Sequence, residues 1–239
     1  MKLIFIRHGD PDYSIDSLTE KGWREADCLS KRVAKWENIS EIYVSPLGRA
    51  KDTASLSLKA LNRTAIEKPW LREFYYQVDP HKENPVQTGL WDYFPETWSS
   101  AQYAFDKDNW FKNPLLNNPE IEPAYKEVCR GIDDILKEHG YERKDNIYVR
   151  TKEEKDEVIV FFCHLGVSLL ILGYLLKMSP FQLWHTFFVA PTSVTILGTE
   201  ERTPGLAHFR AQVVGDTRHL SDCNEPISKS GYYTDCFQG

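Results

Sequence analysis

Short apolar runs alternate with segments of helical periodicity along this chain, and this alternation restricts the fold more than any other feature. The clearest runs are residues 2–6 (KLIFI) and 158–163 (VIVFFC). Continuous apolar runs are typical of strands that are covered on both faces. Helical segments between such strands supply the long crossovers that parallel pairing needs. We therefore expect a three-layer α/β/α fold with a mostly parallel sheet.

Individual elements follow from finer patterns. Trp23, Ala26 and Leu29 recur at helical spacing after Thr19, a typical N-cap residue, and Gly140 suits a helix end. The expected strands are 2–6, 41–45, 158–163, 193–197 and 207–214, with a weaker one at 64–67; the expected helices are within 18–36, at 46–61 with Pro46 in its first turn, at about 123–139, after Gly166 and from about Pro180; residues 141–157 are expected to form a solvated hairpin or loop.

Residues 74–122 break the alternation. They are rich in aromatic residues, Pro and Asn and have little periodicity. The segment is too aromatic for a disordered linker, and long irregular segments in compact domains are usually functional. Two interpretations stay open: a helical or loop cap over a site, or a packed insertion without substrate contact. We see no clear boundary between domains, so residues 1–239 are expected to form a single domain with this insertion.

Composition argues against several classes of partner. The net charge is −6 and no basic block occurs, which disfavours nucleic-acid binding. Five scattered cysteines without a C-x-x-C pair favour a reducing, cytoplasmic compartment. Residues 158–176 lack charged side chains, but His164 and Gly166 interrupt them after a β-branched first part. A strand, a turn and a buried helix therefore explain this stretch better than a membrane span. Composition leaves the oligomeric state open.

Cations and imidazoles follow the expected strands. Arg7 and His8 come after the first strand, Arg49 follows the second, and His164 and Gly166 follow the strand at 158–163. Ligands of open α/β sheets bind beyond the carboxyl ends of the strands. Arginine presents a planar fork that matches phosphate oxygens, and the helix that begins near Gly166 adds backbone N–H donors. These residues predict a site for a phosphate dianion.

Four motifs occur in a fixed order: Arg7-His8-Gly9, LTEKGWREA at 18–26, SPLGRAKDTA at 45–54, and CHLG with His164. On these motifs the chain resembles the histidine phosphatase superfamily, the phosphoglycerate-mutase-like proteins. The likeness covers most of the chain outside 74–122, and WLREF supplies Glu73 where one branch of the family carries its acid. The resemblance implies a phosphoglycerate-mutase-like fold and the activity of a histidine acid phosphatase-type phosphomonoesterase.

The resemblance also implies a role for each matched residue. A neutral nitrogen of His8 attacks phosphorus and forms a phosphohistidine, which divides one displacement into two easier steps. Arg7, Arg49 and a protonated His164 bind the phosphate oxygens. Glu73 protonates the leaving alcohol and then deprotonates the attacking water, unless it is an ordinary surface carboxylate.

The glycines of the motifs act through the backbone in this scheme. Gly9 lets the chain approach the phosphate closely, and Gly166 offers its N–H group. No metal or other cofactor is required. Further candidates follow the last expected strand: Asp216 and Thr217 hold the phosphate-binding histidine or a loop, and His219 either lines the site or is an exposed loop residue.

The chain departs from the mutase branch directly after its first motif. That branch continues E-S/T-x-x-N, whereas this chain has Asp10 and Pro11, and Leu165 replaces a usual glycine after the second histidine. Proline offers neither a hydroxyl nor an N–H group. We therefore favour a phosphatase of a small phosphorylated metabolite over a phosphoglycerate mutase. The residues leave two more functions open: a metal-dependent hydrolase that uses Asp10, Asp12 and the histidines, and a non-enzymatic module that binds a phosphate ligand or a protein.

Overall fold

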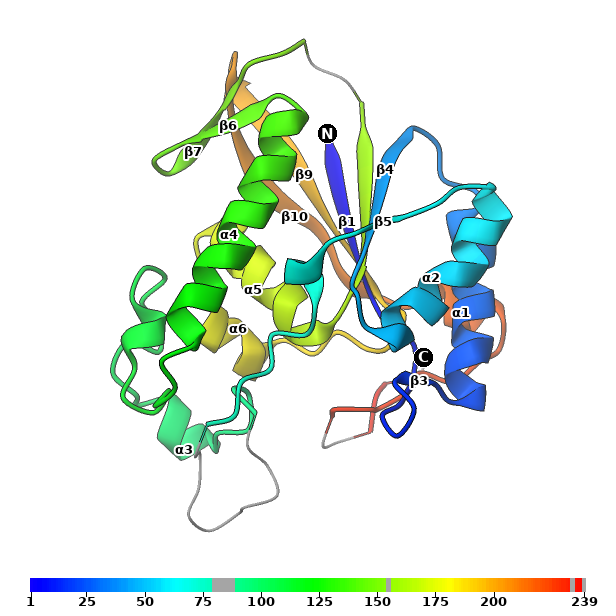
Figure 1. The fold of residues 1–239 in the computed structure, drawn as a ribbon, viewed down its shortest axis with the longest axis horizontal. Helices are drawn as coiled ribbons and strands as arrows, with labels where there is room; N and C mark the ends of the chain where they lie inside the picture. Colours follow the sequence, from blue (N-terminus) through cyan, green and yellow to red (C-terminus); the bar gives the residue numbers. More distant parts are fainter. Residues whose placement is uncertain (79–88, 154–155, 233–234, 238–239) are drawn as a thin grey trace.

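A central sheet lies between two layers of helices (Figure 1). The computed structural model describes residues 1–78, 89–153, 156–232 and 235–237. Within them the main sheet has eight strands in the order β5-β4-β8-β1-β9-β10-β7-β6. The first four are parallel, and the other four pair antiparallel. The strands are β1 Lys2–Arg7, β4 Ile39–Val44, β5 Ile66–Glu67, β6 Tyr141–Lys144, β7 Ile147–Arg150, β8 Val158–Cys163, β9 Val194–Thr203 and β10 Leu206–Asp216, with a small second sheet of β2 Pro11–Asp12 and β3 Ser17–Leu18.

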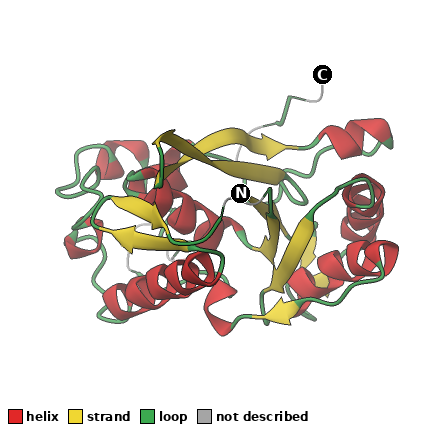
Figure 2. Cartoon of the chain, turned by 90° about the horizontal axis from the view of Figure 1, so that it is seen from above, coloured by secondary structure: helices red, strands yellow, loops and turns green. Residues whose placement is uncertain are grey.

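Helices cover both faces of the sheet, as Figure 2 shows from above. Leu3 and Phe5 of β1 belong to one core cluster together with side chains of α4, α5 and α6. Ile4 and Ile6 belong to a second cluster with side chains of α1 and α2. Successive strand residues point to opposite faces, so one apolar run serves both clusters. The expected three-layer α/β/α fold is confirmed. The helices are α1 Glu20–Val33, α2 Gly48–Leu61, α3 Pro95–Trp98, α4 Ile121–Glu138, α5 Leu165–Leu176, α6 Pro180–Thr186 and α7 Arg218–Asp222, with short 3₁₀ turns at Pro69–Leu71 and Trp110–Lys112.

The helix ends follow capping chemistry. The Thr19 hydroxyl accepts a hydrogen bond from a backbone N–H of the first turn of α1, as expected of an N-cap. Gly140, after α4, has a φ of +88°, which glycine adopts without strain. Two starts differ from the prediction. Pro46 lies outside α2 because the residue after it is extended (φ −75°, ψ 139°). The helix α5 begins before Gly166, with His164 as its N-cap.

The insertion packs against the helices on one face of the sheet. Phe74, Leu90, Tyr93 and Trp110 are buried in the same core cluster as α4, α5 and α6. The expected hairpin is present within 141–157, and it extends the sheet because β7 pairs with β10. In the described part of the chain, no helix has both the length and the apolar character needed to cross a bilayer. The stretch 158–176 divides into β8 and α5.

Candidate active site

The two motif histidines lie side by side at the carboxyl ends of β1 and β8. These strands are parallel neighbours in which Arg7 is the register partner of Cys163, so the residues that follow are brought together. The ring centroids of His8 and His164 are 5.1 Å apart. The backbone N–H of His8 donates to the Cys163 carbonyl at 2.9 Å, which fixes the loop after β1. Both imidazoles are buried.

His8 carries its ring proton on Nδ1. This nitrogen lies 2.8 Å from the Gly9 carbonyl oxygen, which can only accept a hydrogen bond. Burial, followed by the positive charge of Arg7, lowers the pKa of His8 well below 6.5. The imidazole is therefore neutral, with its lone pair on Nε2. That is the form in which histidine acts as a nucleophile.

Two arginines lie near both histidines, and their charges contribute to the lowered pKa of each imidazole. Arg7 donates from Nη1 and Nη2 to two backbone carbonyls, and Arg49 Nη1 donates to the Asp16 carboxylate at 2.5 Å. The Nε atoms of both arginines are buried without a partner among the described residues, as is Nδ1 of His164. Buried polar atoms are nearly always paired, so three unpaired nitrogens in one cluster indicate a binding site for an anion.

His164 is held by Ser45, at the end of β4. Its Nε2 lies 2.7 Å from the Ser45 hydroxyl oxygen, and both side chains are fully buried. Burial and then the neighbouring His8, Arg49 and Arg7 lower the pKa of His164 well below 6.5. The imidazole is thus neutral in the site as it stands. The protonated form expected beside a bound phosphate stays a prediction.

Glu73 reaches this site from the segment before the insertion. Its Oε1 accepts hydrogen bonds from the backbone N–H groups of Phe74 at 2.9 Å and Val167 at 3.2 Å. Burial raises its pKa above 4.5, although the charges of Arg49 and Arg7 oppose that shift. Its surroundings therefore differ from those of an ordinary surface carboxylate.

Gly166 makes room for this arrangement. A Cβ atom at position 166 would lie 2.6 Å from Glu73 Oε1 and 2.6 Å from the Trp91 ring. Any larger residue would displace the carboxylate or the indole. The glycine of the CHLG motif is therefore required by side-chain packing around Glu73.

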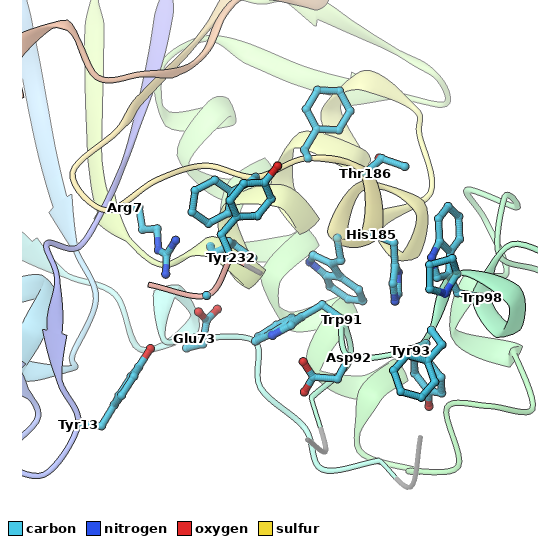
Figure 3. A pocket seen from close by; sticks show the side chains of 17 residues that line it. Arg7, Tyr13, Glu73, Trp91, Asp92, Tyr93, Trp98, His185, Thr186 and Tyr232 are labelled. Carbon is cyan, nitrogen blue, oxygen red and sulfur yellow. The ribbon is translucent and has the colours of Figure 1, made fainter. Parts of the chain in front are cut away.

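A cavity of about 560 Å³ opens beside this cluster (Figure 3). Arg7 and Glu73 lie at one end, Trp91 lies in the middle, and Trp98 lies at the far end. The insertion thus contributes to the wall as well as to the core. The remaining lining residues are Tyr13, Asp92, Tyr93, Phe94, Pro95, Leu165, Trp184, His185, Thr186, Phe187, Phe188, Gly231 and Tyr232.

A family model confirms the relationship that the four motifs suggest. The model of the histidine phosphatase superfamily (branch 1) matches residues 3–212. The chain belongs to the histidine phosphatase superfamily. No curated protein sequence matches it.

Solved structures of several phosphatases share the fold at low sequence identity. A phosphoserine phosphatase mutant from Entamoeba histolytica, in complex with phosphoserine, is 20% identical, with a TM-score of 0.59 over 92% of this chain and 98% of that one. Mycobacterial glucosyl-3-phosphoglycerate phosphatase is 19% identical, with a TM-score of 0.61 over 90% and 98%. The alpha-ribazole phosphatase from Shigella flexneri is 18% identical, with a TM-score of 0.59 over 91% and 97%.

The loop after the first motif packs tightly on α1. A Cβ atom at Gly9 would lie 2.9 Å from the Gly22 carbonyl oxygen, and one at Gly22 would lie 2.2 Å from the Asp10 carbonyl oxygen. Packing against α1 therefore requires glycine at position 9, whether or not a phosphate also approaches its backbone. The Asp10 carboxylate accepts hydrogen bonds from Thr19 and Ser228 and so ties the loop to α1 and the C-terminal segment. Throughout the described residues, no three His, Cys, Asp or Glu side chains are grouped to hold a metal ion.

The candidates after β10, which are Asp216, Thr217 and His219, do not line the cavity. His219 is buried at 1% exposure, so it is not an exposed loop residue, and it does not line the cavity. Its Nε2 lies 3.1 Å from the Thr192 hydroxyl, and the Thr192 N–H donates to the carbonyls of Arg7 and His8. Asp216 forms an ion pair with Arg32. Through Thr192, His219 thus supports the backbone of Arg7 and His8.

Thr217 occupies the N-cap position of α7 and makes no side-chain capping bond.

The sequence analysis does not identify two supporting residues, although both lie inside one of the four motifs. They are Ser45, which contacts His164, and Thr53, whose hydroxyl accepts a hydrogen bond from the Gly9 N–H at 2.9 Å. Asp16, the partner of Arg49, has a φ of +49° and lies in no motif. No sequence signal could have identified Asp16.

Proposed function

We propose that this chain is a metal-independent phosphatase, of the histidine acid phosphatase type, that hydrolyses a small phosphomonoester through a phosphohistidine at His8. The observation that carries the proposal is the cluster of buried nitrogens on Arg7, Arg49 and His164, around a neutral His8, that find no partner in the described parts of the chain. A phosphoryl group would supply oxygens to these nitrogens while its phosphorus meets the Nε2 lone pair. Positioning and charge neutralisation account for most of the catalysis of phosphoryl transfer.

Glu73 is the proposed acid and base. Its raised pKa favours a protonated carboxyl group, which would donate to the leaving alcohol oxygen as the bond to phosphorus breaks. The resulting carboxylate would then take a proton from the water that attacks the phosphohistidine. Water attack regenerates His8 and releases inorganic phosphate, so the cycle balances. The insertion is proposed to act as the cap that lines the alcohol subsite.

Return of the phosphoryl group to a second hydroxyl would make the protein a mutase. Pro11 lies where the mutase branch has a hydroxyl, and it pairs with Leu18 in the small second sheet. A reducing, cytoplasmic location is proposed because the five cysteines are scattered along the chain and form no C-x-x-C pair. The natural partner is proposed to be a small phosphorylated metabolite.

The test is release of inorganic phosphate from aryl and alkyl phosphates in the presence of EDTA, with wild type and His8→Ala. We expect activity that survives the chelator and falls by at least about 10³-fold in His8→Ala, because the nucleophile is lost. Acid-labile phosphate on the denatured wild-type protein, absent from His8→Ala, would support the covalent intermediate. Loss of activity with EDTA would overturn the metal-independent mechanism, and interconversion of 2- and 3-phosphoglycerate without net phosphate release would favour the mutase.

A further inference from the structure

We infer that the cavity selects phosphomonoesters whose alcohol part is uncharged and carries an aromatic or other flat apolar group, and that it disfavours esters with a second anionic group. The inference rests on the proposed function, which places the phosphate beside Arg7. Its basis is the shape, the wall chemistry and the charges of the cavity beyond that end.

The cavity extends well past the residues that would hold the phosphate. In Figure 3, Arg7 and Glu73 mark one end, and the side chains of Trp91, His185 and Trp98 continue away from them. A volume of about 560 Å³ is typical of small-molecule sites and exceeds what a phosphate alone needs. An alcohol that leaves past Glu73 would therefore lie along Trp91 toward Trp98.

The walls of this far part are flat aromatic rings that hold one another. Trp91 contacts Trp184 edge to face, with ring centroids 6.3 Å apart. Trp98 stacks on His185 at 5.1 Å with an interplanar angle of 22°. The polar atom of Trp184 is already used, because its Nε1 donates to the Gly166 carbonyl at 2.9 Å. Such walls favour the faces and edges of other rings over hydrated polar groups.

The charges disfavour a second anion. Among the described lining residues, Arg7 is the one cation, and it lies at the phosphate end. The acidic residues among the described lining are Glu73 and Asp92. His185 is neutral, since its Nδ1 donates to the Phe181 carbonyl and burial lowers its pKa to about 4. A substrate carboxylate in the far part would lose water without gaining a cation from the described lining residues there.

The test compares three esters of primary alcohols, so that leaving-group reactivity is similar: 2-phenylethyl phosphate, glycerol 1-phosphate and 3-phosphoglycerate. We expect kcat/KM for 2-phenylethyl phosphate to exceed that for glycerol 1-phosphate by at least about tenfold and that for 3-phosphoglycerate by about 100-fold. Calorimetric binding of the same esters to His8→Ala, which cannot form the phosphohistidine, should give the same order.

Variants locate the selectivity. Trp98→Ala should reduce the preference for 2-phenylethyl phosphate over glycerol 1-phosphate by about fivefold or more. Trp98→Arg should favour 3-phosphoglycerate, because it introduces a cation at the far end. Phe105→Ala is the matched control, since Phe105 contacts Trp98 but is 56% exposed and does not line the cavity. It should leave all three rates within about twofold of wild type.

The possible outcomes separate this inference from the proposed function. If 3-phosphoglycerate is hydrolysed and bound as well as 2-phenylethyl phosphate, the inference is overturned and the phosphatase stands. If no ester is hydrolysed but His8→Ala binds 2-phenylethyl phosphate selectively, the phosphatase is overturned and the pocket chemistry stands. Equal selectivity in wild type and Trp98→Ala would refute the assignment of the far wall.

Discussion

Replacement of Ser45 by alanine removes the hydrogen bond that holds His164 at the centre of the site. The two side chains are fully buried and lie 2.7 Å apart at Nε2. Nδ1 of the same ring already lacks a partner among the described residues, so the variant leaves the imidazole without any. Leaving a buried polar group unsatisfied costs about 1–3 kcal/mol.

Ser57→Ala is a matched control in α2. Its hydroxyl is also fully buried but has no partner among the described residues, so its removal loses no hydrogen bond. We expect its free energy of unfolding to stay within about 0.5 kcal/mol of wild type or to rise. The Tm of a chain of this size changes by about 2–4 °C per kcal/mol, so Ser45→Ala should melt about 2–12 °C lower than wild type.

The assays are urea unfolding, calorimetry and phosphate release from an aryl phosphate. Because His164 would lose its fixed orientation, kcat in Ser45→Ala should fall about 10–100-fold, whereas Ser57→Ala should retain wild-type kcat. Equal destabilisation of the two variants would refute the reasoning. It would show that removal of any buried hydroxyl, and not loss of the contact with His164, determines the decrease in the free energy of unfolding.

Three further predictions concern ionisation and packing. For an alkyl ester, the acid limb of kcat/KM, where His8 gains a proton, should have its midpoint well below pH 6.5, and the alkaline limb, where Glu73 loses a proton, should have its midpoint above pH 4.5. Glu73→Gln should abolish the alkaline limb in pH–rate profiles and slow alkyl esters more than aryl ones. Gly166→Ala should lower kcat for alkyl esters by at least about tenfold, because a Cβ atom displaces Glu73 or Trp91, and unchanged steady-state rates would contradict this. Burial raises the pKa of Glu25 to about 7, so the protonated form that stabilises the fold is fully present below pH 4.5 and is lost as pH rises to about 7. The free energy of unfolding of the wild type should therefore decline over this range, and Glu25→Gln should remove up to about 3 kcal/mol of the decline when chemical unfolding is measured across it.

The sequence was sufficient for the parallel half of the sheet and for the residues at its carboxyl edge. Continuous apolar runs such as 158–163 are typical of strands that are covered on both faces. The polar residues that follow such strands meet because neighbouring parallel strands end at the same edge of the sheet. The antiparallel half was harder to specify. Whether β7 pairs with β10 depends on tertiary contacts of a charged hairpin whose local sequence also suits an exposed loop.

The supporting contacts of the site show a similar limit. Asp16 meets Arg49 because a residue at φ +49° turns the chain back toward α2, and no periodic pattern encodes such a turn. The sequence places His219 in a loop after a strand, where an exposed histidine is expected. In the structure α7 packs on α1, and His219 is buried against Thr192. Long-range contacts of this kind depend on packing between elements distant in the chain, which local propensity does not describe.

Burial accounts for the two opposite ionisation states on which the proposed reaction depends. The same desolvation lowers the pKa of His8, whose charged form is a cation, and raises the pKa of Glu73, whose charged form is an anion. Arg7 strengthens the shift of His8, the proposed nucleophile, and opposes that of Glu73, the proposed acid. A more exposed Glu73 beside the same arginines would ionise at lower pH. Gly166, where a Cβ atom would meet both the Glu73 carboxylate and the Trp91 ring, is therefore part of the arrangement on which the proposed general acid depends.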